Sequence, residues 1–373
     1  MSKYDIAAFV WPSYTGDENR TKIFWPEGYG EWQTVKAMTN KGYDGCRWPR
    51  KPLWGYVNEA DPRIMEMQIQ CAVDYGVNTF IYDWYWFDDR PFLENCLNDG
   101  FLKARNNKDM KFYLMWANHN ATHLWDKRNS ADLSTVIWKG AVTPEIWDKI
   151  TDRTIEKYFS VDNYYKIDGC PVYMIFDIDN FLRTFGTSEK AKAGLDLFRE
   201  KTIKAGFPGL HIQIVHWRKR TYGWLPEGDS AKGCTVEQLY SFLGADSVTN
   251  YNWGGSANLD GDYSAITDEY MESITDTDSN ISIPFYPNIT IGWDNNVRFN
   301  DFIPGVVKNN TPEAFGETCR RVKEFADKKL ADGKMKAPLI TVNSWNEWTE
   351  TSYLQPDDLY GYGYLEKIKE IFG

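Results

Sequence analysis

Apolar residues fall in eight short runs along the chain, and longer segments with helical spacing separate them. Most runs are apolar on both faces, as expected for strands of a parallel sheet that is covered on both sides. We predict strands over Asp5–Val10, Val77–Asp83, Lys111–Ala117, Pro171–Asp177, His211–Trp217, Asp246–Asn252, Pro284–Thr290 and Ala337–Asn343.

Helices are predicted where apolar residues recur every three to four positions. These segments are Asp61–Tyr75, Glu189–Ala205, Thr311–Leu330 and Tyr364–Phe372. Repeated β-then-α units predict a single (β/α)8 TIM barrel over residues 1–373. An open doubly wound sheet is the alternative, but no Gly-rich phosphate loop follows the first strand. Thr15–Asn58 is rich in Gly, Trp and Pro, and we predict a long insertion there that forms a wall of the site.

Composition narrows the possible partners. The net charge of −11 disfavours binding to nucleic acid or to an anionic membrane surface. No apolar run approaches the ~18 residues of a membrane helix. The six cysteines form no CxxC pair, and we expect free thiols, no metal and no cofactor. Met1–Trp11 has no signal-peptide pattern, so we expect a cytoplasmic monomer, or a periplasmic or secreted one if a leader has been removed.

The predicted strand ends are rich in aromatic and hydrogen-bonding side chains. The chain has 17 Trp, 23 Tyr and 20 Phe, and every predicted strand but the fourth has a tryptophan at or near its end. Active sites of TIM barrels lie at this end, and such side chains suit the faces and hydroxyls of sugars. We therefore predict a carbohydrate substrate, bound by Trp11, Asp83, Trp84, Tyr85, Trp86, Trp116, Asn118, His119, Asp177, His216, Tyr251, Trp293, Asp294, Trp345, Asn346 and Trp348.

Four polar residues have more specific predicted roles. Asp83 either holds sugar hydroxyls or caps a following helix. Asp294 and Arg298 either pair and brace the eighth loop or are surface charges. Tyr251 is a candidate for positioning a glutamate through its hydroxyl.

Two glutamates follow the last predicted strand in the sequence NSWNEWTET. Glycoside cleavage commonly uses two carboxyl groups. Positions three apart face opposite sides of a strand but the same side of a helical turn. If the chain turns after Asn343, Glu347 and Glu350 both enter the cleft as catalytic residues, and Trp345 or Trp348 would raise the pKa of one of them by desolvation. Alternatively, both are ordinary surface glutamates.

Several stretches together resemble glycoside hydrolase family 99 and the WbsX-like proteins of polysaccharide gene clusters. They are GEWQTVKAM (30–38), FIYDWYWF (80–87), WANHNATHLWD (116–126), IGWDNNVR (291–298) and NSWNEWTETSYLQP (343–356). The resemblance implies a retaining α-glycosidase, endo-acting on a manno-configured oligo- or polysaccharide. It implies that Glu347 is the base for the sugar 2-hydroxyl, which attacks the anomeric carbon, and that Glu350 is the general acid/base.

Two positions depart from the family patterns. His119 stands where WbsX-like relatives typically have an acidic residue, and Thr349 where family 99 often has histidine. Two other functions stay open from the sequence: a glycosyltransferase-like protein of polysaccharide biosynthesis and a non-catalytic carbohydrate-binding barrel.

Overall fold

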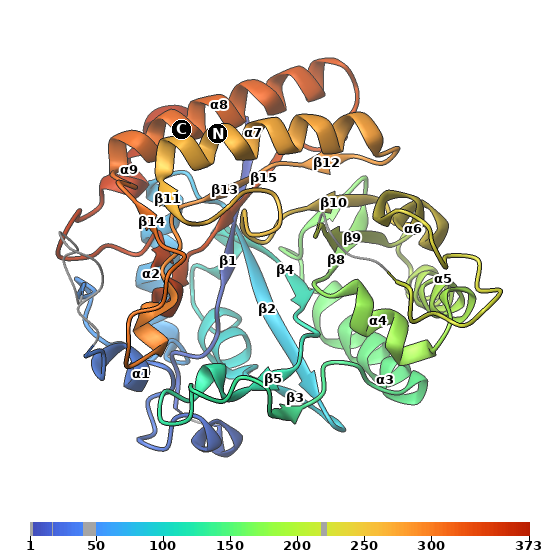
Figure 1. Cartoon of the computed structure of the whole chain (residues 1–373), viewed down its shortest axis with the longest axis horizontal. Helices are drawn as coiled ribbons and strands as arrows, with labels where there is room; N and C mark the ends of the chain where they lie inside the picture. Colours follow the sequence, from blue (N-terminus) through green and yellow to red (C-terminus); the bar gives the residue numbers. More distant parts are fainter. Residues whose placement is uncertain (1–2, 17, 40–49, 218–221) are drawn as a thin grey trace.

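The computed structural model describes residues 3–16, 18–39, 50–217 and 222–373 (Figure 1). Cys46 and parts of the predicted insertion at 15–58 lie outside the described residues. Figure 1 shows the strands at the centre, with α2 on one side, α3 to α6 on the other, and α7 to α9 along the top.

The central sheet confirms the predicted TIM barrel. Its neighbouring strands run parallel in the order β12-β10-β9-β8-β4-β2-β1-β15-β13. The strands are β1 (Asp5–Val10), β2 (Thr79–Phe87), β4 (Lys111–Trp116), β8 (Cys170–Ile175), β9 (His211–Val215), β10 (Ser247–Thr249), β12 (Phe285–Tyr286), β13 (Asn288–Thr290) and β15 (Leu339–Asn343).

Pro287 divides the seventh predicted strand into β12 and β13. The first half pairs with β10 and the second half with β15. Proline cannot donate a ladder hydrogen bond, so a strand is readily interrupted there. Strands β12 and β13 are the two ends of the strand order. Because they are consecutive halves of one stretch of chain, that stretch completes the barrel.

The main helices cover the sheet from outside. They are α1 (Trp32–Lys36), α2 (Pro62–Asp74), α3 (Pro144–Thr154), α4 (Ile178–Phe185), α5 (Ser188–Lys204), α6 (Val236–Leu243), α7 (Tyr263–Asn280), α8 (Pro312–Ala331) and α9 (Gly363–Phe372). The Asp61 carboxylate accepts from the Arg63 N–H at 2.8 Å and so caps α2, while Thr311 caps α8. Within the described ranges, no helix has the length and apolar character needed to cross a bilayer.

Short elements decorate the barrel, mostly at the carboxyl ends of its strands. The strands are β3 (Arg90–Phe92), β5 (Ala121–Thr122), β6 (Val136–Trp138), β7 (Lys166–Ile167), β11 (Gly261–Asp262), β14 (Val307–Lys308), β16 (Asn346–Glu347) and β17 (Ser352–Tyr353). The short helices are η1 (Asn19–Ile23), η2 (Cys96–Phe101), η3 (Asn107–Asp109), η4 (His123–Trp125), η5 (Ile155–Phe159), η6 (Asn295–Arg298) and η7 (Trp348–Glu350).

Candidate active site

The two glutamates lie on a tight hairpin that follows β15. Strands β16 and β17 pair antiparallel, and the 3₁₀ turn η7 connects them. Glu347 ends β16 and Glu350 ends η7, so the chain turns between them and both carboxyl groups reach the same cavity. The predicted turn is therefore present, and it begins at Trp348, five residues after Asn343.

Asn346 fixes this hairpin to the end of β1. Its Oδ1 accepts from the Trp11 N–H at 2.8 Å, and its Nδ2 donates to the Trp11 carbonyl at 2.9 Å. The same Nδ2 also donates to the buried carboxylate of Glu59 at 2.8 Å. Gln68 and Gln355 donate to the other oxygen of Glu59, so the loop rests on a connected set of buried amides.

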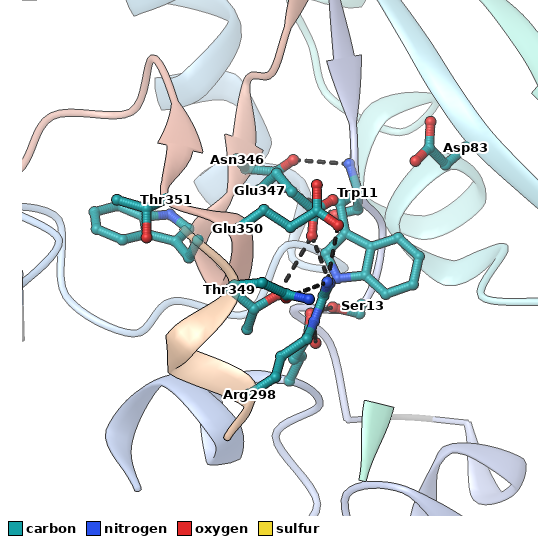
Figure 2. A network of polar contacts seen from close by, with 12 residues as sticks. Trp11, Ser13, Asp83, Arg298, Asn346, Glu347, Thr349, Glu350 and Thr351 are labelled. Atoms are coloured by element: carbon teal, nitrogen blue, oxygen red, sulfur yellow. Dashed lines mark hydrogen bonds and ion pairs between the residues drawn. The ribbon is translucent and has the colours of Figure 1, made fainter. Parts of the chain in front are cut away.

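Arg298 joins the two glutamates. Its Nη2 donates to Glu347 Oε1 at 2.9 Å and its Nη1 donates to Glu350 Oε1 at 2.8 Å (Figure 2). The arginine is at the end of η6, in the loop after β13, and only 3% of its side chain is exposed. Arg298 therefore braces the eighth loop as predicted, but it does so through the two glutamates and not through Asp294, and it is not a surface charge.

A third carboxyl group, Glu31, approaches Arg298 beside the pair. Its Oε1 lies 3.5 Å from Arg298 Nε, and its other oxygen accepts hydrogen bonds from the Trp11 indole and, at 3.2 Å, from the Ser13 hydroxyl. Glu31 precedes α1 and is completely buried. Glu31 was not among the predicted site residues, although it lies in the GEWQTVKAM stretch that carries part of the family resemblance.

Burial dominates the electrostatics of this group. It raises the pKa of Glu347 well above its usual value, and the neighbouring Glu350 adds to the increase while Arg298 opposes it. Burial alone would lower the pKa of Arg298, but Glu350, Glu31 and Glu347 outweigh it and raise that pKa. The guanidinium therefore stays charged and partly neutralises three carboxyl groups.

Tyr251 connects Glu347 to a fourth carboxyl group. The Tyr251 hydroxyl lies 3.1 Å from Asp83 Oδ2 and 3.4 Å from Glu347 Oε2. Asp83 lies within β2 and the strand continues after it, so it caps no helix. Burial raises the pKa of Asp83 well above its usual value.

These side chains open into a cavity of about 200 Å³. Trp11, Tyr85, Trp125 and Phe176 supply aromatic walls, with Met115, Ala117 and Leu124 between them. Trp125 contacts both Trp11 and Tyr85, with ring centroids 5.3 and 5.5 Å apart. A cavity with carboxyl groups on one side and aromatic faces on the other suits a hydroxyl-rich ring with one apolar face.

His119 lies at the edge of the cavity in a defined tautomer. Its Nδ1 is 3.0 Å from the carbonyl of Asn120, which can only accept, so Nδ1 carries the proton. Nε2 then accepts from the Tyr85 hydroxyl at 3.2 Å. Burial lowers the pKa of His119, which favours this neutral form.

The structure brings seven of the predicted residues to the cavity. They are Trp11, Asp83, Tyr85, His119, Tyr251, Glu347 and Glu350. The cavity also includes Arg298 and residues absent from the predicted set, chiefly Trp125 and Phe176. Trp125 lies in the WANHNATHLWD stretch that carries part of the family resemblance. The sequence did not show that a short helix after Thr122 turns this side chain into the cavity.

The other predicted residues do not line this cavity. They are Trp84, Trp86, Trp116, Asn118, Asp177, His216, Trp293, Asp294, Trp345, Asn346 and Trp348. Alternation along strands explains several of them, because Asp83 and Tyr85 point inward while Trp84 and Trp86 point outward. The Trp84 indole, for example, donates to Glu94 at 2.9 Å behind the sheet.

The tryptophans next to the glutamates are also turned away from the cavity. The Trp345 indole donates to Gln68 at 2.8 Å, and the Trp348 ring stacks on Tyr353 with centroids 3.8 Å apart. These tryptophans therefore do not desolvate a glutamate from within the cavity, contrary to the prediction. Other side chains bury the glutamates. Trp345 and Trp348 shape the hairpin from behind.

Polar residues at other strand ends hold loops together. Asn118 exchanges hydrogen bonds of 2.7 Å with the backbone N–H and carbonyl of Asp177. The Asp177 carboxylate caps α4, and the Asp294 carboxylate accepts from the Asn296 N–H at 2.9 Å and caps η6. The described cysteines are free, and no group of three or more His, Cys, Asp or Glu among the described residues suits a metal ion.

Solved structures with the same architecture are glycoside-hydrolase barrels. A glycoside hydrolase-like protein is 15% identical, with a TM-score of 0.60 and coverage of 100% of this chain and 94% of the other. Two structures of the GH99 endo-alpha-mannosidase from Bacteroides thetaiotaomicron, one of them with bound BIS-TRIS-propane, are 13% and 12% identical. Their TM-scores are 0.56 and 0.53, and both cover 98% of this chain and 95% of the other. The protein thus has the TIM-barrel fold of glycoside hydrolases.

At the level of sequence, residues 6–368 match the family described as Glycosyltransferase WbsX, and the chain belongs to this family. Two proteins of Xanthomonas campestris pv. campestris, both described as uncharacterized protein WxcX, are 22% identical over 350 residues. The match covers 93% of this chain and 46% of each relative, so the chain spans about half the length of these relatives.

Proposed function

We propose that the protein is a retaining α-glycosidase that acts on a manno-configured oligo- or polysaccharide through participation of the substrate 2-hydroxyl. The observation that supports this most is the pair of carboxyl groups on one hairpin, both hydrogen-bonded to Arg298 at 2.8–2.9 Å. One guanidinium balances one negative charge, which favours a shared proton on this pair and hence one acid and one base.

In the first step, Glu347 removes the proton from the 2-hydroxyl as that oxygen attacks the anomeric carbon. Glu350 donates a proton to the glycosidic oxygen, so the bond to the leaving group breaks as the new C–O bond forms. The products of the step are a 1,2-anhydro sugar, a protonated Glu347 and an ionised Glu350. The free Oε2 of Glu350, buried and without a partner in the described structure, is available for the glycosidic oxygen.

In the second step, Glu350 removes a proton from water, and the water oxygen attacks the anomeric carbon. The bond from that carbon to O2 breaks, and Glu347 returns its proton to O2. Both carboxyl groups regain their initial states. Two inversions at the same carbon give net retention.

The experiment is a glycan-array screen to identify the ligand, followed by proton NMR of the sugar released from it. We expect the first anomer released to keep the α-configuration. Glu350→Gln should abolish cleavage of that glycan while binding persists, and Glu313→Gln, at an exposed helical position, serves as the matched control. Wild-type turnover by Glu350→Gln would overturn the proposal, and binding without cleavage by the wild type would favour a non-catalytic carbohydrate-binding barrel.

The family description favours a second candidate, a glycosyltransferase of polysaccharide biosynthesis. A nucleotide-sugar donor needs positive charge or a metal ion for its diphosphate. The Asp177–Asp179 segment has the letters of a metal motif, but Asp177 caps α4 and Asp179 pairs with Arg183 at 2.6 Å. Manganese-dependent binding of a nucleotide sugar would favour this candidate over the hydrolase.

A further inference from the structure

The hydroxyl of Tyr251 lies between two carboxyl groups, and it has one proton to donate. It is 3.1 Å from Asp83 Oδ2 and 3.4 Å from Glu347 Oε2. If both carboxyl groups were ionised, one of them would face the lone pairs of the tyrosine oxygen with no donor between them. The arrangement is satisfied when one carboxyl group supplies a second proton.

The surroundings identify which of the two groups carries that proton. Glu347 has Arg298 at 2.9 Å and the Thr349 hydroxyl at 3.3 Å, and both are donors that stabilise an anion. Asp83 has the shared tyrosine hydroxyl alone, its Oδ1 has no partner among the described residues, and its exposed fraction is 3%. Burial of an ionised carboxylate with so few hydrogen-bond donors has a high free-energy cost, whereas burial of the neutral acid has a much lower one.

We propose that Asp83 works as an uncharged carboxylic acid that donates to the Tyr251 oxygen, so that the Tyr251 hydroxyl donates to Glu347. Asp83 is then a positioning residue, because it acts on Glu347 through the tyrosine. This inference rests on the proposed function for its catalytic meaning, but the proton on Asp83 is a property of the free protein.

Oδ1 of Asp83 has a role of its own. It is an oxygen of a cavity-lining residue, it has no partner among the described residues and, in the neutral acid, it remains an acceptor. A sugar presents several hydroxyl donors, so we infer that a second substrate hydroxyl, beside the one that Glu347 contacts, donates to this oxygen. The ligand class is then a ring with two neighbouring free hydroxyls rather than one substituted at both positions.

The other charged or titratable groups of the cavity are consistent with this assignment. Those facing Asp83 are Tyr251, Glu347, Glu350, Arg298, Tyr85 and His119. Glu350 places no positive charge beside Asp83 in either protonation state, and Arg298 is already engaged by Glu31, Glu347 and Glu350. His119 is neutral in its tautomer and places no positive charge beside Asp83.

The first test needs no substrate. Protein labelled with ¹³C at the aspartate carboxyl carbons is titrated by NMR, and the Asp83 signal is the one absent from Asp83→Asn. We expect this signal to keep the chemical shift of the protonated acid at pH 7, about three pH units above the usual aspartate pKa. Tyr251→Phe should move the same signal. An ionised Asp83 at pH 7 would overturn the proposal, even if the hydrolase function is correct.

The second test uses cleavage of 4-methylumbelliferyl α-D-mannopyranoside, or of the array-identified glycan if that is the better substrate. Asp83→Ala should lower kcat/KM by about 10²-fold through misplacement of Tyr251 and Glu347. Asp83→Asn supplies a neutral donor and acceptor and should recover most of that loss. It should also lack the decline that the wild type shows at high pH, as Asp83 ionises. Equal inactivity of Asp83→Asn and Asp83→Ala would show that Asp83 acts as an anion and would overturn the proposal.

Discussion

Arg298 and Glu347 meet at the carboxyl end of the barrel, with Arg298 Nη2 2.9 Å from Glu347 Oε1, although 49 residues separate them in the chain. Both side chains are at most 3% exposed. A buried ion pair of this kind contributes little net stability when complete, but loss of one partner leaves an uncompensated charge. The pair is therefore a sensitive point for both folding and chemistry.

Replacement of this arginine gives the first prediction. Arg298→Met should lower the free energy of unfolding at pH 7 by about 3–5 kcal/mol, because three buried carboxyl groups lose their cation. Urea unfolding measures the change, and Arg320→Met is the control, because Arg320 is an exposed arginine whose ion pairs are screened by solvent and should contribute little to stability. Equal effects of the two substitutions would contradict the structural role given to Arg298.

Glu59 should make stability depend on pH. Burial raises its pKa to about 7, above the ordinary value of 4.5 that it regains on unfolding. Between these values the folded state binds the extra proton, so the contribution of Glu59 is complete below pH 4.5 and is lost as pH rises to about 7. The loss amounts to roughly 3 kcal/mol.

The measurement for Glu59 is a comparison of unfolding free energies across this range of pH. Glu59→Gln removes the titration, so the difference between the wild type and the variant should shift in favour of the variant as pH rises from 4.5 to 8. A difference that stays constant over this range would show that Glu59 has an ordinary pKa in the folded protein.

The wall of the cavity can be tested with two tryptophans. Trp125 lines the cavity, whereas Trp116 packs outward on Trp147 with ring centroids 5.1 Å apart. Trp125→Phe should raise KM about fivefold through loss of aromatic contact with the sugar, while Trp116→Phe should lower the free energy of unfolding by about 1–3 kcal/mol. Steady-state kinetics and thermal unfolding of both variants distinguish these roles, and a larger KM effect at Trp116 would contradict the geometry.

His119 should remain neutral at pH values where an ordinary histidine becomes charged. Burial lowers its pKa from 6.5, and the Asn120 carbonyl fixes the proton on Nδ1. ¹⁵N NMR of the imidazole should show the neutral Nδ1–H tautomer at pH 6, with His119→Asn identifying the signal. Titration of that signal at 6.5 or above would rule out the described environment.

The sequence predicted the barrel well because its strands are buried on both faces and are therefore visible as apolar runs. The two ranges Asp5–Val10 and Leu339–Asn343 lie at or within their predicted strands. The interruption at Pro287 was not anticipated, although proline is a local signal for it. Helix α5 begins at Ser188, one residue before its predicted start at Glu189, because the Thr187 side chain accepts the capping hydrogen bond.

The site was harder to predict, because a residue's position near a strand end does not show which way its side chain points. Trp84 and Trp86 were grouped with Asp83 and Tyr85, yet alternate residues of β2 face opposite sides of the sheet. Glu31 lies in the insertion after the first strand, and no hydrophobic periodicity there predicts that its side chain reaches the site. Arg298 and Glu350 illustrate the same limit, since their contact at 2.8 Å depends on how two loops from different strands meet.

The excess of carboxyl groups over cations at the cavity has a consequence for inhibition. Glu31, Glu347 and Glu350 surround one guanidinium, so a ligand that brings its own positive charge would improve the balance of charge. A ring in which a basic nitrogen replaces the anomeric carbon would place its ammonium group where positive charge develops during glycoside cleavage. Under the proposed function we therefore expect protonated azasugars to bind, and their affinity would report on the charge of the cavity.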